Sequence, residues 1–241
     1  MRSIGGECGG AGCRSLAGAV VCPPAAAARG RAVVKVLVIG ATGKTGRLVL
    51  ARLLDQGHEV TAFARRPSAV PPAGDRLRIV QGDAHDAASI HRAVAGQDAV
   101  IATFGPRTLR RTDVQEALMR NLVAAMTDCR VRRLVNLSAW GSGGGAVPPH
   151  AFFVRFFLLP ILLRHVLADK RRGEAHLFGS DLDYTNVCPA RIKDLPARGN
   201  VRASLDGRGL EQVMHREDLA QFLVAQLTTA RWIRRCVAIG Y

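Results

Sequence analysis

The chain has 241 residues, of which 48% are hydrophobic and 22% charged, enough apolar sequence to close one sizeable core. No run of about 18 apolar residues is free of charge, so we expect no transmembrane segment. The net charge of +15 comes almost entirely from arginine. Because no basic run interleaves with stacking aromatic residues, we expect no specific nucleic-acid partner.

The six cysteines contain no CxxC pair. Those in the body of the chain lie far apart in apolar surroundings, as buried free thiols do in a reducing compartment. We therefore expect a cytoplasmic protein without a metal site.

Residues 1–32 differ in composition from everything that follows, being rich in Gly, Ala, Cys and Pro. We interpret them as a disordered extension or as sequence upstream of the true start, with a transit peptide as the alternative. Residues 33–241 are expected to form a single domain.

Strand and helix patterns alternate through this domain. The apolar run VVKVLVIG at 33–40 leads into ATGKTG and a helical period that ends at Gly57. The further strands expected are 58–64, 77–81, 98–104, 132–138 and 183–188, and the further helices are 86–95, 112–128, 169–179 and 215–228. This alternation predicts an α/β fold, a doubly wound Rossmann fold with a mostly parallel sheet covered on both faces.

A glycine turn joins the first strand to the first helix. Gly40, Gly43 and Gly46 have the spacing GxxGxxG, which permits a tight turn and lets backbone N–H groups approach a pyrophosphate. Because the turn lies between an apolar strand and a helix, it predicts dinucleotide binding. The alternative is a structural turn without a ligand.

The end of the second strand bears on the choice of dinucleotide. NAD sites place an acidic residue there for the ribose, whereas a 2′-phosphate requires cations. Here the strand ends in Arg65 and Arg66, with no acid. Arg65 can bind a phosphate through two charged hydrogen bonds, which favours NADPH; the alternative is two solvated arginines on a loop.

Several longer motifs carry a family resemblance. GATGKTG, GHEVTAFARRPS, VQGD, VAGQDAVIATFG, RNLVAAM, NLSAW, SLDGRG and VMHREDLAQFLVAQLTT together resemble the biliverdin-IXβ reductase and NADPH-dependent flavin reductase family, atypical short-chain dehydrogenases. The resemblance covers nearly all of 33–241. It implies further cofactor-binding residues beyond the three glycines and the two arginines: Thr42, Lys44 and Thr45 at the pyrophosphate, Asp83 and Ala84 at the adenine, and Gly105 near the nicotinamide ribose.

The catalytic pair Tyr-x-x-x-Lys of classical short-chain dehydrogenases is missing. Val166 stands four residues before Lys170, and Cys188 stands four after Tyr184. Alcohol dehydrogenation by that route is therefore not expected. Ser138 matches the family's active-site serine and could donate a hydrogen bond to the substrate or carboxamide; its alternative is a strand-end cap. Lys170, expected at the start of a helix, could bind ribose hydroxyls or be a solvated helix charge.

The expected acceptor is a small planar conjugated molecule such as a flavin, a quinone or a tetrapyrrole. Such a ring takes hydride directly from NADPH when the two planes stack, and solvent can supply the proton. Arg107, with Arg110 and Arg111, could attract an acidic substrate or form a plain solvated run. Arg191 stands where some family members carry histidine, a departure that bears on tetrapyrrole specificity.

An apolar stretch at 149–168, PHAFFVRFFLLPILLRHVLA, follows the flexible GSGGGAVPP. It resembles a hydrophobic lid, expected at about 142–168, inserted between the serine and the lysine. The alternatives for this stretch are contact with a membrane surface and a homodimer interface.

Two functions remain open at this point. The favoured one is an NADPH-dependent reductase of a planar acceptor. The other is a non-catalytic NADP-binding regulator that senses redox state.

Overall fold

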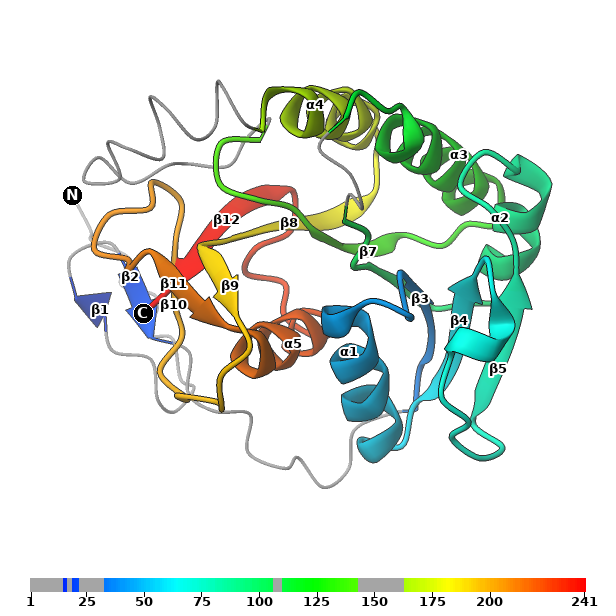
Figure 1. Cartoon of the computed structure of the whole chain (residues 1–241), viewed down its shortest axis with the longest axis horizontal. Coiled ribbons are helices and arrows are strands. Elements are labelled where there is room, and N and C mark those ends of the chain that lie inside the picture. The colour runs from blue at the N-terminus through cyan, green and yellow to red at the C-terminus, as the bar shows by residue number, and fades with distance from the viewer. Residues whose placement is uncertain (1–14, 17–18, 22–32, 106–109, 143–162) are drawn as a thin grey trace, which may run out of the picture.

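The computed structural model describes residues 15–16, 19–21, 33–105, 110–142 and 163–241. Within them, one ten-stranded sheet runs through the protein in the order β1-β2-β10-β12-β8-β7-β6-β3-β4-β5 (Figure 1). The strands from β5 to β12 in this order pair in parallel, whereas β10, β2 and β1 continue the sheet antiparallel.

Apart from a half-exposed strand at the sheet edge, Leu77–Gln81, the parallel strands arise from short, largely buried apolar runs, typical of a sheet covered on both faces. Their bounds are β3 Lys35–Ile39, β4 Glu59–Ala64, β5 Leu77–Gln81, β6 Ala99–Ala102, β7 Arg133–Leu137, β8 Asp183–Pro189 and β12 Arg235–Gly240. The first six confirm the expected strands to within a few residues. The last was not expected from the sequence.

Helices cover both faces of the sheet (Figure 1). Helices α1 (Lys44–Asp55) and α5 (Arg216–Ala225) pack together on one face. The other face carries α2 (Ala87–Val94), α3 (Val114–Asp128) and α4 (Arg164–Phe178), with α3 between the other two. The doubly wound α/β fold is therefore confirmed.

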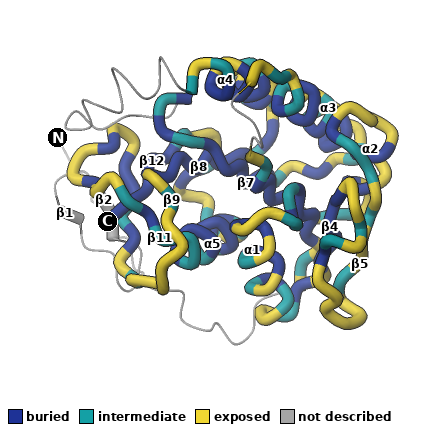
Figure 2. The backbone as a smooth tube through the Cα atoms, viewed as in Figure 1, coloured by how far each residue is buried: buried dark blue, intermediate teal, exposed yellow. Residues whose placement is uncertain are grey.

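Two apolar cores lie on opposite faces of the sheet. One joins α1 and α5 to alternate residues of the strands, such as Val36 and Val135. The other joins α2 and α3 to residues of opposite parity, such as Leu37 and Leu134. The strands and the inner sides of the helices are accordingly the most buried parts of the chain (Figure 2). Among the described residues, no helix is both long and apolar enough to cross a bilayer.

Short strands complete the structure near the C-terminus. β9 (Arg191–Lys193) and β11 (Val213–His215) form a parallel pair, and β10 (Arg202–Ser204) extends the main sheet. Their three-residue length explains why no periodicity predicts them.

Two pieces of the N-terminal segment are described. β2 (Ala19–Val21) pairs with β10 at the sheet edge, and β1 (Ser15–Leu16) pairs with β2. These two strands differ from the expected disorder. The domain boundary at residue 32 stays a prediction, because the neighbouring residues lie outside the described parts of the chain.

Candidate cofactor and active site

The glycine turn is built between the end of β3 and the start of α1. Gly40 has a φ of +83°, and its carbonyl accepts a hydrogen bond of 2.9 Å from the Gly43 N–H. A Cβ atom on Gly46 would lie 2.1 Å from the Gly40 carbonyl oxygen. Glycine is therefore required at 40 by the backbone and at 46 by the close approach of helix to strand.

Gly43 has a different role in the same turn. Its φ of −76° suits any residue, and a Cβ there would meet only the Gly40 carbonyl oxygen, at 3.2 Å. Gly43 is also the N-cap of α1, and no side chain caps that helix end. The first N–H groups of α1 thus remain available to an anion, as a pyrophosphate site requires.

The turn opens into a pocket at the point where the strand order reverses. β3 lies between β4 and β6, and the carboxyl ends of all three strands border the pocket. Thr103, just after β6, donates from Oγ1 to the Ile39 carbonyl at 3.0 Å and ties the two strand ends together. Ligands of open α/β sheets bind at this place.

Seven of the predicted cofactor-binding residues line this pocket: Gly40, Thr42, Gly43, Arg65, Asp83, Ala84 and Gly105. Open space surrounds the Cα of Gly105. The remaining walls are mostly apolar and come from residues that sequence reasoning missed: Ile39, Phe63, Ala64, Gly82, Thr103, Phe104, Val114 and Leu118. Phe104 and Leu118 belong to apolar patterns that predicted only a strand and a helix.

The other four predicted cofactor-binding residues do not line the pocket. Lys44 forms a 2.6 Å ion pair with Asp194, and Thr45 accepts a 2.8 Å hydrogen bond from Arg216. Gly46 faces the Gly40 backbone, and Arg66 is exposed at the start of a short 3-10 helix, Pro67–Ala69. Because Arg216 also pairs with Asp194, these contacts bind the start of α1 to the start of α5.

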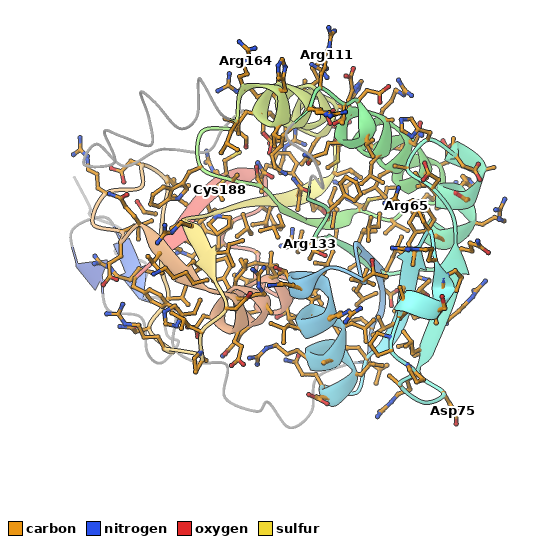
Figure 3. All side chains as sticks on the ribbon, in the orientation of Figure 1. Arg65, Asp75, Arg111, Arg133, Arg164 and Cys188 are labelled. Atoms are coloured by element: carbon orange, nitrogen blue, oxygen red, sulfur yellow. The ribbon has the colours of Figure 1, made fainter. Side chains whose placement is uncertain are left out.

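Arg65 and Asp83 bring opposite charges to the rim of the pocket. Arg65 extends from the end of β4 (Figure 3), with its Nε 4.0 Å from Asp83 Oδ2. The backbone N–H of His85 donates to Asp83 and is the main reason why the pKa of that carboxyl lies below its usual value. The hydrogen bonds that Asp113 and Asp83 accept from its ring raise the pKa of His85.

Ser138 follows β7 and belongs to a buried polar cluster beneath α4. Its hydroxyl donates to Oε1 of Glu174, and the same oxygen accepts from Ser142 at 3.0 Å and from Asn186 at 3.2 Å. Glu174 is 1% exposed, and its other oxygen, Oε2, has no hydrogen-bond partner among the described residues. Sequence reasoning missed Glu174, although it stands one helical turn after Lys170.

Lys170 is buried in the second turn of α4 rather than solvated at a helix start. Its ammonium donates to the Leu137 carbonyl and to Gln115 Oε1, both at 3.1 Å. Burial lowers the pKa of Lys170, whereas the nearby Glu174 opposes that shift. Lys170 and Ser138 thus both lie at the carboxyl end of β7, and neither lines the pocket.

Two thiols, the buried Cys188 and the half-buried Cys236, lie beside this cluster. Asn186 donates to Cys236 Sγ at 3.5 Å, and burial raises the pKa of both Cys188 and Cys236 above the ordinary value. Cys188 lies in the interior of the protein (Figure 3). These thiols therefore behave as packing residues rather than nucleophiles.

The remaining predicted site residues have mixed outcomes. Arg191 starts β9, is exposed and does not line the pocket. Arg107 lies outside the described residues, and so does most of the expected lid, 143–162. The last lid residues from Arg164 onward belong to α4 instead, and Arg164 points away from the sheet (Figure 3). The described residues contain no cluster suited to a metal ion.

Comparison with known proteins extends these observations. A family model described as NAD(P)H-binding matches residues 40–230. A (4-alkanoyl-5-oxo-2,5-dihydrofuran-3-yl)methyl phosphate reductase of Streptomyces griseus is 40% identical over 103 residues, 43% of this chain and 34% of that protein. The chain spans less than half the length of the first curated relatives it matches.

Solved structures share the fold. A short-chain dehydrogenase/reductase from Veillonella parvula in complex with NADP has a TM-score of 0.72 at 18% identity, covering 87% of this chain and 95% of the other. ChuY, an anaerobillin reductase from Escherichia coli, has a TM-score of 0.73 at 18% identity, covering 86% and 96%. The glycine turn, the pocket and the family match agree, and the chain belongs to the NAD(P)H-binding family.

Proposed function

We propose that this protein is an NADPH-dependent reductase that transfers hydride to a small planar conjugated acceptor, of the flavin, quinone or tetrapyrrole type. The Ser138 hydroxyl, whose proton is directed at a buried carboxylate, is the observation that carries this proposal. It supports a reaction in which Ser138 does not donate its proton to the substrate.

The pocket fits the cofactor at three places. The uncapped start of α1 offers N–H groups to the pyrophosphate, and Gly43 keeps the backbone open to it. Arg65 provides a guanidinium at the end of β4, where a 2′-phosphate would lie, and it is half exposed. The apolar walls formed by Phe63, Ala64 and Leu118 suit the flat faces of the adenine.

The polar cluster positions groups but supplies no ready proton. A carboxylate oxygen only accepts hydrogen bonds, so the single proton of Ser138 is directed at Glu174, and the Ser138 oxygen also contacts Ser142 Oγ at 2.5 Å. The Lys170 ammonium donates hydrogen bonds to Leu137 and Gln115, and its third hydrogen could orient a ribose hydroxyl. No tyrosine stands at position 166, where Val166 is buried in α4.

These residues favour a reaction that draws its proton from solvent. When bound, NADPH supplies the hydride, and a conjugated ring can delocalise the charge that results. The protein contributes position, by stacking the acceptor on the nicotinamide ring. The similarity of this chain to a reductase from Streptomyces griseus supports the reaction class.

The test follows the loss of NADPH with FMN, a quinone and a dye as separate acceptors, and the reduction of NADP+ with simple secondary alcohols as the control. We expect NADPH oxidation with at least one ring acceptor and no alcohol oxidation. Dinucleotide binding without oxidation by any acceptor would contradict the reductase and support the redox-sensing regulator. Oxidation of a secondary alcohol would contradict the proposal that this site has no residue to transfer a proton to or from the substrate.

A further inference from the structure

His85 joins two carboxylates at the rim of the cofactor pocket. Its Nδ1 lies 3.2 Å from Asp83 Oδ1, and its Nε2 lies 3.2 Å from Asp113 Oδ1. Asp83 lines the pocket after β5, and Asp113 precedes α3, whose first turn also lines it. Both contacts are hydrogen bonds only when both ring nitrogens carry hydrogen, which is the charged imidazolium.

Asp113 is available to His85 because another residue caps α3. Asp169 of α4 accepts hydrogen bonds from the N–H groups of Gln115, at 3.2 Å, and Glu116, at 3.1 Å. Asp113 makes no capping bond with its own side chain. Its carboxylate therefore faces outward to His85 across the rim.

Asp83 is shared between two cations. One is His85, and the other is Arg65, whose Nε lies 4.0 Å from the second carboxylate oxygen. An uncompensated carboxylate at this place competes for the Arg65 guanidinium and repels any second anion that approaches it. A protonated His85 cancels that charge.

Charged residues of the neighbouring helices also surround His85. Asp86 caps α2 through the N–H groups of Ala88 and Ser89, and its pKa is lowered by those bonds. Arg172 of α4 stabilises the charged form of Asp113 from a distance. His85 is thus the titrating group of this rim near neutral pH, since the aspartates beside it stay ionised there.

We propose that His85 is a specificity-determining residue for the cofactor: its protonated ring neutralises Asp83 and leaves Arg65 to bind a phosphate on the adenosine ribose. This inference rests on the proposed cofactor site. NAD has no anion at that ribose, so its affinity does not depend on this balance. The preference for NADP over NAD is therefore greatest when His85 is charged and falls as pH rises.

The experiment measures the dissociation constants of NADP+ and NAD+ by isothermal titration calorimetry, at about pH 6 and about pH 8. For the wild-type protein we expect the ratio Kd(NAD+)/Kd(NADP+) to fall about threefold between these values, the size of effect typical of an exposed charge pair. The ribose phosphate itself gains charge over this range, because its second pKa is about 6, which acts in the opposite direction.

Variants separate the two effects. We expect the same result for His85→Gln and for a second substitution, His85→Asn. In both variants the ratio should no longer fall with pH and should change only with the charge of the ribose phosphate. The control is His91→Gln, which replaces an exposed histidine of α2 whose ring contacts Cys129. In this variant the ratio should fall with pH as it does in the wild type. The double variant Asp83→Asn/His85→Gln should restore the high ratio at both pH values, because it removes the carboxylate as well.

A wild-type ratio that is constant or rises with pH would overturn the inference. A fall in both His85 variants equal to that of the wild type would overturn it too. If both dinucleotides bind as expected but no acceptor oxidises NADPH, the proposed reductase fails and this inference stands. If neither dinucleotide binds, the cofactor site and the inference fail together.

Discussion

Ser138 donates a hydrogen bond to Glu174 across the space between the end of β7 and α4, joining residues 36 positions apart in the chain. The carboxylate accepts three hydrogen bonds on one oxygen and lies almost fully buried. The serine is thus held in one orientation by a residue that the active-site motif does not contain.

The first prediction concerns Ser138. If the serine only orients the ligands, Ser138→Ala should lower turnover with a flavin acceptor by less than about a hundredfold, whereas an obligatory proton donor would cost about 10²–10⁴-fold. Steady-state kinetics at saturating acceptor measure this. Ser142→Ala, which removes a second hydroxyl from the same Glu174 oxygen, is the matched control and should have a smaller effect. A loss above a thousandfold with unchanged cofactor affinity would identify Ser138 as a proton donor.

The second prediction concerns Lys170. Lys170→Met removes the ammonium from Leu137 and Gln115 and should raise the KM for NADPH more than it lowers kcat, if the lysine binds the ribose as proposed. It should also lower the free energy of unfolding by about 1–3 kcal/mol, since buried acceptors lose their donor. Arg171→Met, one residue further on the exposed side of α4, is the control and should change neither quantity appreciably. An unchanged KM would contradict the ribose-binding role.

The third prediction separates two glycines of one turn. Gly43→Leu should fold, because its φ is ordinary, yet lose dinucleotide binding, because the side chain occupies the approach to the pyrophosphate. Gly46→Ala should be strongly destabilised, since its Cβ would collide with the Gly40 carbonyl oxygen at 2.1 Å. Thermal denaturation with and without NADP+ measures both effects. A Gly43→Leu protein that NADP+ still stabilises would count against the assignment of the turn.

The fourth prediction concerns the two arginines that follow β4. Arg65→Asp should reverse the preference from NADPH to NADH and weaken NADPH binding at least about tenfold, because a charged hydrogen bond to the phosphate is lost. Arg66→Asp changes the net charge equally but lies off the pocket and should preserve the preference. Fluorescence titrations with each dinucleotide compare them. Equal losses in both variants would indicate general electrostatic attraction instead.

The fifth prediction is a pH dependence of stability. The pKa of His85 is raised in the folded protein, so its contribution is complete below its ordinary value of 6.5 and is lost as pH rises through the folded value. The lowered pKa values of Asp83 and Asp113 contribute stability above 3.8 that is lost in acid. The Tm difference between wild type and His85→Gln should therefore be greatest near pH 5 and shrink toward about pH 8. A Tm difference that grows with pH would contradict the ion pairs of His85 with Asp83 and Asp113.

The sequence alone determined the parallel strands β3 to β8 and the location of the pocket. The buried strand 35–39 and the edge strand 77–81 consist of consecutive or alternating apolar residues, and the Gly40–Gly46 spacing has few other uses between strand and helix. These are local signals, written over a few adjacent residues. The position of Arg65 at the end of β4 could be predicted for the same reason, because the strand directly precedes it in the sequence.

The tertiary structure alone decided which polar groups meet. Glu174 accepts a hydrogen bond from Ser138, and Asp194 forms an ion pair with Lys44 next to the glycine turn. His85 contacts both Asp83 and Asp113. The contacts Ser138–Glu174, Lys44–Asp194 and His85–Asp113 join separate segments of the chain, and nothing in the spacing of these residues marks them. Likewise, the strands β9 and β11 exist because they pair with each other, not because three residues carry a pattern. Contacts between distant segments depend on how helices pack on the sheet, and a single sequence does not contain that geometry in local form.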